Sequence, residues 1–327
     1  MKLRLGLIGL GYIGKVHLRH ALKLTNANLV AVSDISKRAL KNAKSAGVKK
    51  TFDSYEQLLK DPEIDAVIIA LPTHLHLQCA IRAAEERKHI FLEKPIARNV
   101  QEAQEIISAT RRNSVKLMIV YPLRFNSTFR NLKEKINRGT LGDVEIARAT
   151  NVSSGPFFHR MQDYAPTPVP EWWFNKELTG GGVLVDLGCH MINLLRWYFG
   201  EIRDVKSYLS YRFNLDFEDS ATCLAKFASG TLGIISVGWF SQVLNEQIEL
   251  FGTVQYAKTQ HRASSRIVAG AQMLITGRSA FFGPHLEELQ YFVNCLASNL
   301  SPSPSGEEGL KDLQAISLAY DNQIHLD

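Results

Sequence analysis

Residues 3–24, LRLGLIGLGYIGKVHLRHALKL, combine an aliphatic run, three glycines and an amphipathic stretch, in that order. Residues 3–9 predict a short buried strand, and residues 10–24 predict a helix with an apolar face. Gly9, Gly11 and Gly14 form a G-x-G-x-x-G pattern at the junction. In such a turn the first glycine permits the tight bend, the second lets the backbone approach a pyrophosphate, and the third allows close packing of helix and strand. The stretch therefore predicts a dinucleotide-binding turn at the start of a helix.

A second expected strand, residues 28–34, ends at Asp34, twenty residues after Gly14. An acid at this spacing accepts hydrogen bonds from the adenosine ribose of NAD and repels the 2′-phosphate of NADP. We therefore expect NAD as the cofactor. Lys37 and Arg38 follow closely enough to soften that preference, so NADP stays open.

The first 121 residues alternate apolar strands with helical patterns. Further strands are expected at 64–72, 89–95 and 115–122, and helices at 36–47, 76–88 and 99–113. This order predicts an α/β fold with a parallel, doubly wound Rossmann sheet, whose ligands lie beyond the carboxyl ends of the strands. The expected cofactor-binding residues belong to the glycine turn and to these strand ends: Gly9, Gly11, Tyr12, Ile13, Gly14, Asp34, Lys37, Leu71, Pro72, Thr73, His76, Glu93 and Lys94.

After Pro122 the alternation breaks. A helix is expected at 125–139 and a strand at 143–154, followed by a loop rich in proline and aromatic residues at 155–173. Period-two segments at 204–213, 219–228, 230–240 and 246–252 then predict an open antiparallel sheet with one face against helices. Residues 255–283 give no firm prediction, and the last helix, from about Glu307, is expected to pack back on the body. We therefore expect a Rossmann domain at 1–121 and a substrate-binding and oligomerisation α/β domain at 122–327.

The stretch GGGVLVDLGCHMI, residues 180–192, places Asp186 and His190 four positions apart in an apolar run. Residues at this spacing share a helix face. The pair is compatible with a buried structural ion pair. It is also compatible with catalysis, because histidine titrates near neutrality and a neighbouring carboxylate orients the imidazole and favours its charged form.

The chain resembles the glucose–fructose oxidoreductase and inositol dehydrogenase family, Gfo/Idh/MocA, over nearly its whole length. The resemblance rests on five motifs in order: G-x-G-x-x-G at 9–14, PTHLH at 72–76, EKP at 93–95, RF at 124–125 and GGGVLVDLGCH at 180–190. It implies a nicotinamide cofactor held between a Rossmann domain and an α/β domain. It further implies that Lys94 binds and polarises the reacting hydroxyl, that His190 is the general base supported by Asp186, and that His76 packs near the nicotinamide.

Relatives commonly carry an aspartate where this chain has Asn193, which argues against a strictly inositol-type pocket. The expected substrate is a ring secondary alcohol of a sugar, an inositol or a sugar nucleotide. Two alternatives stay open: a redox-neutral, NAD-using glycosidase of the same fold, and a non-catalytic dinucleotide-binding sensor. The expected substrate-binding residues are Lys94, Tyr121, Arg124, Trp173, Asp186, His190 and Asn193.

Composition and residue spacing bear on the expected partners, metal content and cellular compartment. A net charge of +6 without a dense basic run argues against a nucleic-acid partner, and no apolar stretch is expected to cross a membrane. His74 and His76 lack the acid or cysteine cluster of a zinc site, so we expect no metal. Four cysteines without C-x-x-C spacing predict free thiols and a cytoplasmic protein. A homodimer or homotetramer is expected through the sheet, with Leu232, Ile234 and Val237 on its outer face.

Overall fold

The computed structural model describes residues 2–156, 170–241, 244–262 and 283–324. Two compact units form: Met1–Pro122 with Phe282–Leu310, and Leu123–Phe281 with Lys311–Asp327. The expected single boundary after Tyr121 therefore does not account for residues 282–310, which return to the first unit. The reason is the buried face of α10 (Gly283–Ala297): its Phe292 ring lies 5.2 Å from that of Phe91 in the first sheet.

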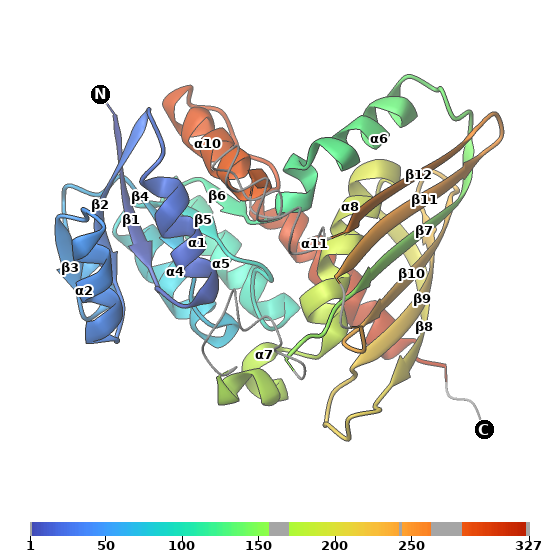
Figure 1. The fold of residues 1–327 in the computed structure, drawn as a ribbon, viewed down its shortest axis with the longest axis horizontal. Helices are drawn as coiled ribbons and strands as arrows, with labels where there is room; N and C mark the ends of the chain where they lie inside the picture. The colour runs from blue at the N-terminus through green and yellow to red at the C-terminus, as the bar shows by residue number, and fades with distance from the viewer. Residues whose placement is uncertain (1, 157–169, 242–243, 263–282, 325–327) are drawn as a thin grey trace. The chain divides into compact units, whose positions relative to one another are not determined.

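The first unit contains a six-stranded, fully parallel sheet in the order β3-β2-β1-β4-β5-β6 (Figure 1). The expected doubly wound Rossmann sheet is thus confirmed. Its strands are β1 (Leu3–Ile8), β2 (Ala27–Ser33), β3 (Lys50–Phe52), β4 (Ala66–Ile69), β5 (His89–Leu92) and β6 (Leu117–Ile119). Strand β3 escaped prediction because three half-buried residues carry no periodic pattern. The strand order reverses between β1 and β4, which places the glycine turn after β1 at the switch point where such sheets bind ligands.

Helices flank this sheet and begin at recognisable caps. Ser36, Ser54 and Asn99 each accept a backbone N–H in the first turn of the helix that follows. The helices are α1 (Tyr12–Ala21), α2 (Lys37–Ser45), α3 (Tyr55–Leu59), α4 (His76–Glu85), α5 (Val100–Arg112) and α10, with the first residues of α11 (Gly306–Asp321).

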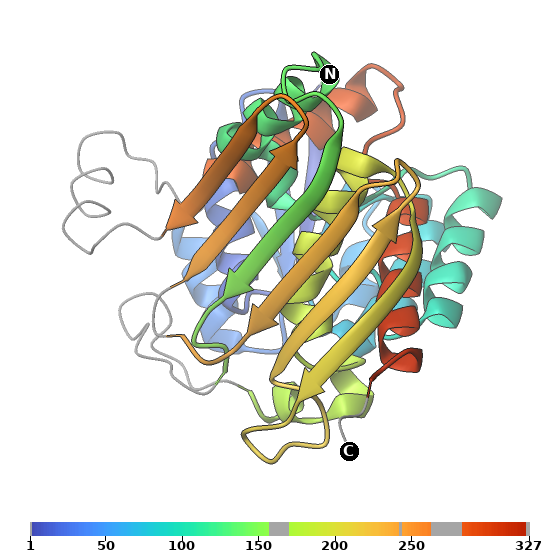
Figure 2. The same cartoon turned by 90° about the vertical axis from the view of Figure 1, so that its right-hand side faces the viewer.

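The second unit contains a six-stranded sheet in the order β12-β11-β7-β10-β9-β8 (Figure 2). Its strands are β7 (Val144–Val152), β8 (Ile202–Ser210), β9 (Ser220–Phe227), β10 (Leu232–Gly238), β11 (Asn245–Gly252) and β12 (Tyr256–Arg262). The sheet is mixed and not wholly antiparallel, because β7 pairs parallel with β10. The long excursion from β7 through the helices to β8 provides the crossover that a parallel pair needs.

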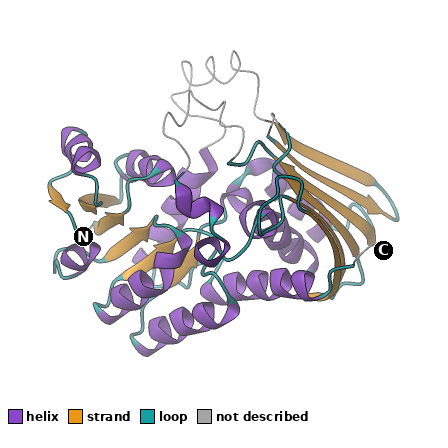
Figure 3. Cartoon of the chain, turned by 90° about the horizontal axis from the view of Figure 1, so that it is seen from below, coloured by secondary structure: helices purple, strands orange, loops and turns teal. Residues whose placement is uncertain are grey.

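Helices α6 (Ser127–Asn137), α8 (Cys189–Phe199) and α11 lie on one side of this sheet (Figure 1). Figure 3 shows helices against one face of the sheet, and short α7 (Lys176–Thr179) precedes α8 in the chain. Burial alternates along the strands, so in β10 Ile235 and Val237 are 1 % exposed while Leu232 is 52 % exposed. The expectation that Val237 lies on the outer face was wrong, because a residue five positions from Leu232 points to the opposite face of a strand.

One helical run among the described residues, Lys176–Phe199, is long and apolar enough to cross a membrane, contrary to the sequence expectation. Its apolar window is 72 % buried inside the protein, as in the core helix of a soluble domain. The four cysteines are free and buried.

Candidate functional site

The glycine turn connects β1 to α1, and its three glycines differ in their surroundings. A Cβ on Gly9, which has φ +91°, would lie 2.4 Å from the Ala70 carbonyl oxygen, and a Cβ on Gly14 would lie 2.1 Å from that of Gly9. A Cβ on Gly11 would meet nothing within 4 Å. Gly9 and Gly14 are therefore required by the fold itself. Gly11 is the position that leaves room for a pyrophosphate, so the turn fits the dinucleotide that the motif predicts.

The amino end of α1 is suited to an anion. Gly11 caps the helix without a side-chain hydrogen bond, and the first turn contains no acidic residue. The first amides of a helix and its dipole favour a phosphate at such an end.

Asp34 follows β2 and accepts two backbone hydrogen bonds. Leu10 N–H donates to its Oδ2 at 2.6 Å, and Ser36 N–H donates to its Oδ1 at 2.7 Å. The carboxylate thus ties the glycine turn to the loop after β2. Each oxygen has a second lone pair, which keeps the expected ribose contact compatible with these bonds.

Thr73, at 8 % exposed, opens a short 3-10 helix after β4, and His76 opens α4. The His76 Nδ1 and Nε2 atoms each lie 2.9 Å from a backbone carbonyl oxygen, of Pro95 and Leu71 respectively. Burial lowers the pKa of this imidazole. The residue is 1 % exposed, and its side chain joins the loops after β4 and β5; its place near the nicotinamide stays a prediction.

The Glu93 carboxylate also makes its contacts within the first unit. Its Oε1 lies 2.6 Å from His17 Nε2, and its Oε2 accepts the Lys94 N–H at 3.2 Å. His17 is fully buried and belongs to α1. The pair therefore connects the helix of the glycine turn to the backbone of Lys94, a role that sequence reasoning did not assign to either residue.

In the second unit the glycine triplet has a structural cause. Gly180 ends α7 with φ +87°, and a Cβ on Gly181 would lie 2.4 Å from the Tyr320 hydroxyl. A Cβ on Gly182 would lie 2.0 Å from the Glu218 carbonyl oxygen. Gly181 and Gly182 are thus required by close packing against the protein's own chain.

Glu218 holds the start of the helix that carries the candidate catalytic pair. Its carbonyl accepts Val183 N–H at 3.0 Å, and its Oε1 accepts Leu184 N–H at 2.9 Å and the Tyr320 hydroxyl at 2.8 Å. Glu218 is 1 % exposed, and burial raises the pKa of its carboxyl group. Sequence reasoning missed this residue because its partners are 34 and 102 positions away.

Asp186 lies in a π-helical turn, Leu184–Gly188, and His190 lies in the first turn of α8. Both side chains are half-buried, whereas most of their neighbours in the run are buried. Single π-helical turns are rare and frequently occur at functional sites. Asp186 Oδ2 accepts a hydrogen bond from Trp239 Nε1 at 3.1 Å, a contact that the sequence did not reveal.

Asn193 was expected to face a substrate on the same helix, but it is 1 % exposed. Its Oδ1 accepts Arg124 Nε–H at 2.6 Å, and its Nδ2 donates to Asp312 Oδ2 at 2.6 Å. Asp312 also pairs with Arg196. Asn193 and Arg124 thus belong to a buried network that joins α8 to α11, and this arrangement leaves no Asn193 amide group facing a substrate.

Two further expected substrate residues differ in exposure. Tyr121 is 2 % exposed, and its amide donates to Glu288 Oε1 at 2.6 Å. Trp173 is half-buried, with its ring 5.4 Å from Trp172 and 6.4 Å from Trp239. The rest of the aromatic loop before it, residues 157–169, lies outside the described residues.

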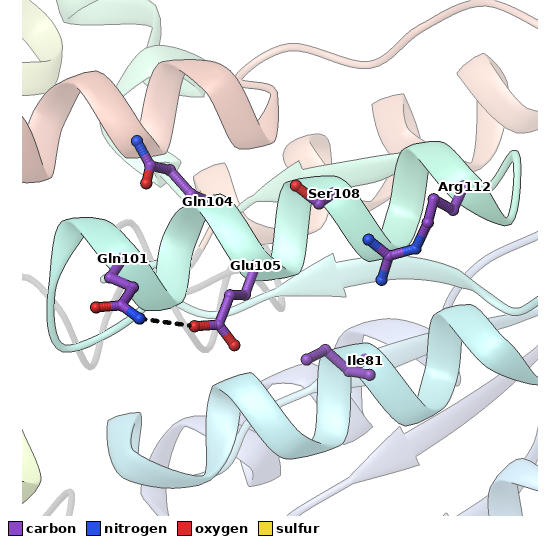
Figure 4. A pocket seen from close by; sticks show the side chains of 6 residues that line it. All are labelled: Ile81, Gln101, Gln104, Glu105, Ser108 and Arg112. Atoms are coloured by element: carbon purple, nitrogen blue, oxygen red, sulfur yellow. Dashed lines mark hydrogen bonds between the residues drawn. The ribbon is translucent and has the colours of Figure 1, made fainter.

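A surface pocket lies between α4 and α5, lined by Ile81, Gln101, Gln104, Glu105, Ser108 and Arg112 (Figure 4). It includes none of the expected site residues, and the Gln101 amide donates to Glu105 within it. Within the described ranges, no group of three or more histidine, cysteine, aspartate or glutamate residues could hold a metal ion.

Both units match models of known protein families. Residues 3–121 match the profile of an oxidoreductase family with an NAD-binding Rossmann fold, and residues 129–257 match the Gfo/Idh/MocA C-terminal domain. The chain belongs to the Gfo/Idh/MocA family. This member is therefore an oxidoreductase with an NAD-binding domain, as the motifs predicted.

Individual relatives of this Gfo/Idh/MocA protein are similar over almost their full length. Myo-inositol 2-dehydrogenase of Thermotoga maritima is 28 % identical over 94 % of this chain and 92 % of its own. The crystal structure of a probable dehydrogenase from the same organism superposes with a TM-score of 0.84 at 27 % identity, covering 98 % of this chain and 96 % of its own. The WlbA dehydrogenase from Bordetella pertussis, solved with NADH and UDP-GlcNAcA, has a TM-score of 0.83 at 25 % identity, covering 98 % and 95 %.

Proposed function

We propose that this protein is an NAD-dependent dehydrogenase that oxidises a ring secondary hydroxyl of a sugar, an inositol or a sugar nucleotide. The observation that carries the proposal is the half-buried pair Asp186 and His190 at a π-helical turn. The names of the similar proteins, an inositol dehydrogenase and a dehydrogenase solved with a nucleotide sugar, support this substrate class.

The assigned roles follow from the chemistry of alcohol oxidation. His190 accepts the hydroxyl proton, and Asp186 orients the imidazole and stabilises its charged form. Lys94 binds the hydroxyl and stabilises the developing alkoxide charge. When bound, NAD supplies the hydride acceptor. Gly11 and the open amino end of α1 would hold its pyrophosphate, and Asp34 its adenosine ribose.

Asn193 is buried, so it is not among the residues proposed to contact the substrate. Its amide is used by Arg124 and Asp312. The half-buried Trp173 remains a candidate contact for the apolar face of a sugar ring.

A panel of sugars, inositols and nucleotide sugars, followed at about 340 nm with NAD and with NADP, tests the proposal. We expect reduction of NAD with at least one cyclic substrate, and tighter binding of NAD than of NADP because of Asp34. Activity restricted to open-chain 2-hydroxy acids or hydrophobic alcohols would refute the substrate class. Turnover without net reduction by a protein that retains its cofactor would favour the glycosidase alternative. Cofactor binding without turnover of any cyclic compound would favour the sensor.

A further inference from the structure

Trp239 follows β10 directly and is 1 % exposed. Its indole Nε1–H donates to Asp186 Oδ2 at 3.1 Å, although the two residues are 53 positions apart. An indole N–H is a donor only, and it carries no charge that changes with pH. A buried tryptophan normally directs this group at a specific acceptor. Here the acceptor is one of the three residues to which catalytic roles are assigned.

The indole ring is held from several directions. The Trp239 backbone N–H donates to the Asp219 carbonyl oxygen at 2.9 Å. Phe217 packs edge-on against the ring, with centroids 6.2 Å apart at 89°, and Trp173 packs at 6.4 Å and 61°. Gly155 lies so close that a Cβ there would be 2.2 Å from the Trp239 Cγ. The direction of the N–H is therefore set by packing and does not depend on a ligand.

We propose that Trp239 is a positioning residue that orients the Asp186 carboxylate for His190. The inference rests on the proposed function of this pair. The indole N–H binds Oδ2 and so restricts rotation of the carboxylate, whose residue lies four positions before His190. A carboxylate fixed in this way keeps the histidine in the orientation and tautomer that proton transfer requires. Trp239 itself touches neither the proton nor the hydride.

The Trp239→Phe variant removes the donor and keeps an aromatic ring. We expect kcat to fall about tenfold, the usual effect of losing a hydrogen bond to a charged group, while KM changes by less than about twofold. Phe227→Leu is the matched control, because it removes a buried aromatic ring of the same sheet that packs on Phe199 and leaves the indole and its packing in place. Its melting temperature should fall, while kcat stays within about twofold of the wild-type value.

A double-mutant cycle separates an effect through Asp186 from a general effect on folding. In an Asp186→Asn background, Trp239→Phe should change kcat by less than about twofold, because the carboxylate that it orients is absent. A full tenfold loss in that background, or wild-type kcat in the Trp239→Phe single variant, would overturn the inference. If Asp186→Asn and His190→Ala both keep wild-type turnover, the proposed function itself fails, whatever Trp239 does.

A spectroscopic measurement covers the case in which Trp239→Phe does not fold. The chain has four tryptophans, so ¹⁵N-labelled protein gives a small set of indole resonances. Replacing Asp186 with Asn changes the charge on the acceptor, and one indole N–H resonance should shift well beyond the others. Four unmoved resonances would overturn the proposed contact.

Discussion

The glycine turn at residues 9–14 and the glycine triplet at residues 180–182 need glycine for different physical reasons. In the first motif, Gly9 and Gly14 avoid clashes within the protein, while Gly11 faces open space. In the second motif, Gly181 and Gly182 lie against Tyr320 and Glu218, so that the helix carrying Asp186 begins at a defined place. Only Gly11 therefore gives evidence for a ligand. The others show how closely the chain packs around the places where a ligand is expected.

Gly11→Ala should separate folding from cofactor binding. Gly11 has φ −62°, which alanine adopts readily, so the free energy of unfolding should change by less than about 0.5 kcal/mol. The methyl group would occupy the space assigned to the pyrophosphate, and NAD affinity should fall about tenfold or more. Calorimetric titration and urea unfolding measure the two quantities.

Gly14→Ala is the control for Gly11→Ala. Its Cβ would lie 2.1 Å from the Gly9 carbonyl oxygen, so the overpacked variant should lose about 1–3 kcal/mol of stability. Equal stability of the two alanine variants, or normal NAD binding by Gly11→Ala, would contradict this account of the turn.

The roles assigned to His190 and Lys94 predict specific kinetics. His190→Ala should lower kcat by about 10²–10⁴, the usual contribution of a positioned acid–base group. Lys94→Ala should cause comparable damage, because the developing alkoxide loses its cation. Fluorescence titration should show little change in NAD affinity for either variant. A variant with near-normal turnover would remove that residue from the mechanism.

Helices α1 and α10 pack through three buried histidines. The His285 ring of α10 lies 6.2 Å from that of His17 and 6.4 Å from that of His20, both in α1. Burial lowers the pKa of His20 to about 4, and it lowers the pKa of His285 well below the ordinary value; the neighbouring histidines act in the same direction. Three charged groups act on these rings: Glu93, which pairs with His17, Arg19 of α1, and Lys23, which follows that helix.

This packing predicts acid destabilisation. Below a pH of about 6.5 the unfolded chain binds protons at His20 and His285, whereas folded His20 binds its proton only near the pKa of about 4. The free energy of unfolding should therefore fall as the pH decreases from about 6.5 to about 4. His285→Gln should make this fall less steep, as measured by urea unfolding with far-UV circular dichroism.

The same two proteins contain an internal control. Between pH values of about 7.5 and 8.5 His20 and His285 are neutral in both states, so wild-type protein and His285→Gln should depend on pH equally. Parallel pH profiles across the acid range would show that His285 makes no contribution of this kind.

Beyond the single chain, the uncovered face of the second sheet suggests an assembly. The register aligns Tyr256, Phe251, Ile146 and Leu232 in one row across four adjacent strands, and Ile234 pairs with Leu224 in the next row. Leu224, Leu232 and Tyr256 are at least half exposed, at 50 %, 52 % and 52 %. A contiguous apolar row of this kind usually marks a protein interface. We therefore retain the expectation of a homo-oligomer formed through this sheet.

Light scattering at micromolar concentration should give a mass of two or four chains for the wild-type protein. Leu232→Lys places a charge at the end of the apolar row, beside Lys226, and should shift the mass towards the monomer. Leu300→Lys is the matched control, because Leu300 is 61 % exposed but belongs to the first unit. A monomeric wild-type protein would contradict the assembly.

The local sequence pattern was sufficient to predict those helices, strands and turns whose formation depends on neighbouring residues. The glycine turn, the alternation of strands and helices in the Rossmann unit and the period-two strands of the second unit are all visible within stretches of about ten residues. Five motifs in order were enough to identify the family and its NAD-binding domain. These elements and motifs can be recognised from short stretches because steric and capping preferences act between residues only a few positions apart.

Contacts between residues far apart in the sequence could be identified only in the folded structure. No local pattern places β7 between β10 and β11, returns residues 282–310 to the first unit, or brings Trp239 to Asp186. Asn193 shows the same limit: it was expected to bind substrate, yet Asp312, 119 positions later, binds its amide in the interior. Burial and hydrogen bonding depend on which surfaces meet in three dimensions. A residue's periodicity therefore predicts its direction from the helix axis, while the tertiary packing determines whether it meets solvent, substrate or another buried side chain.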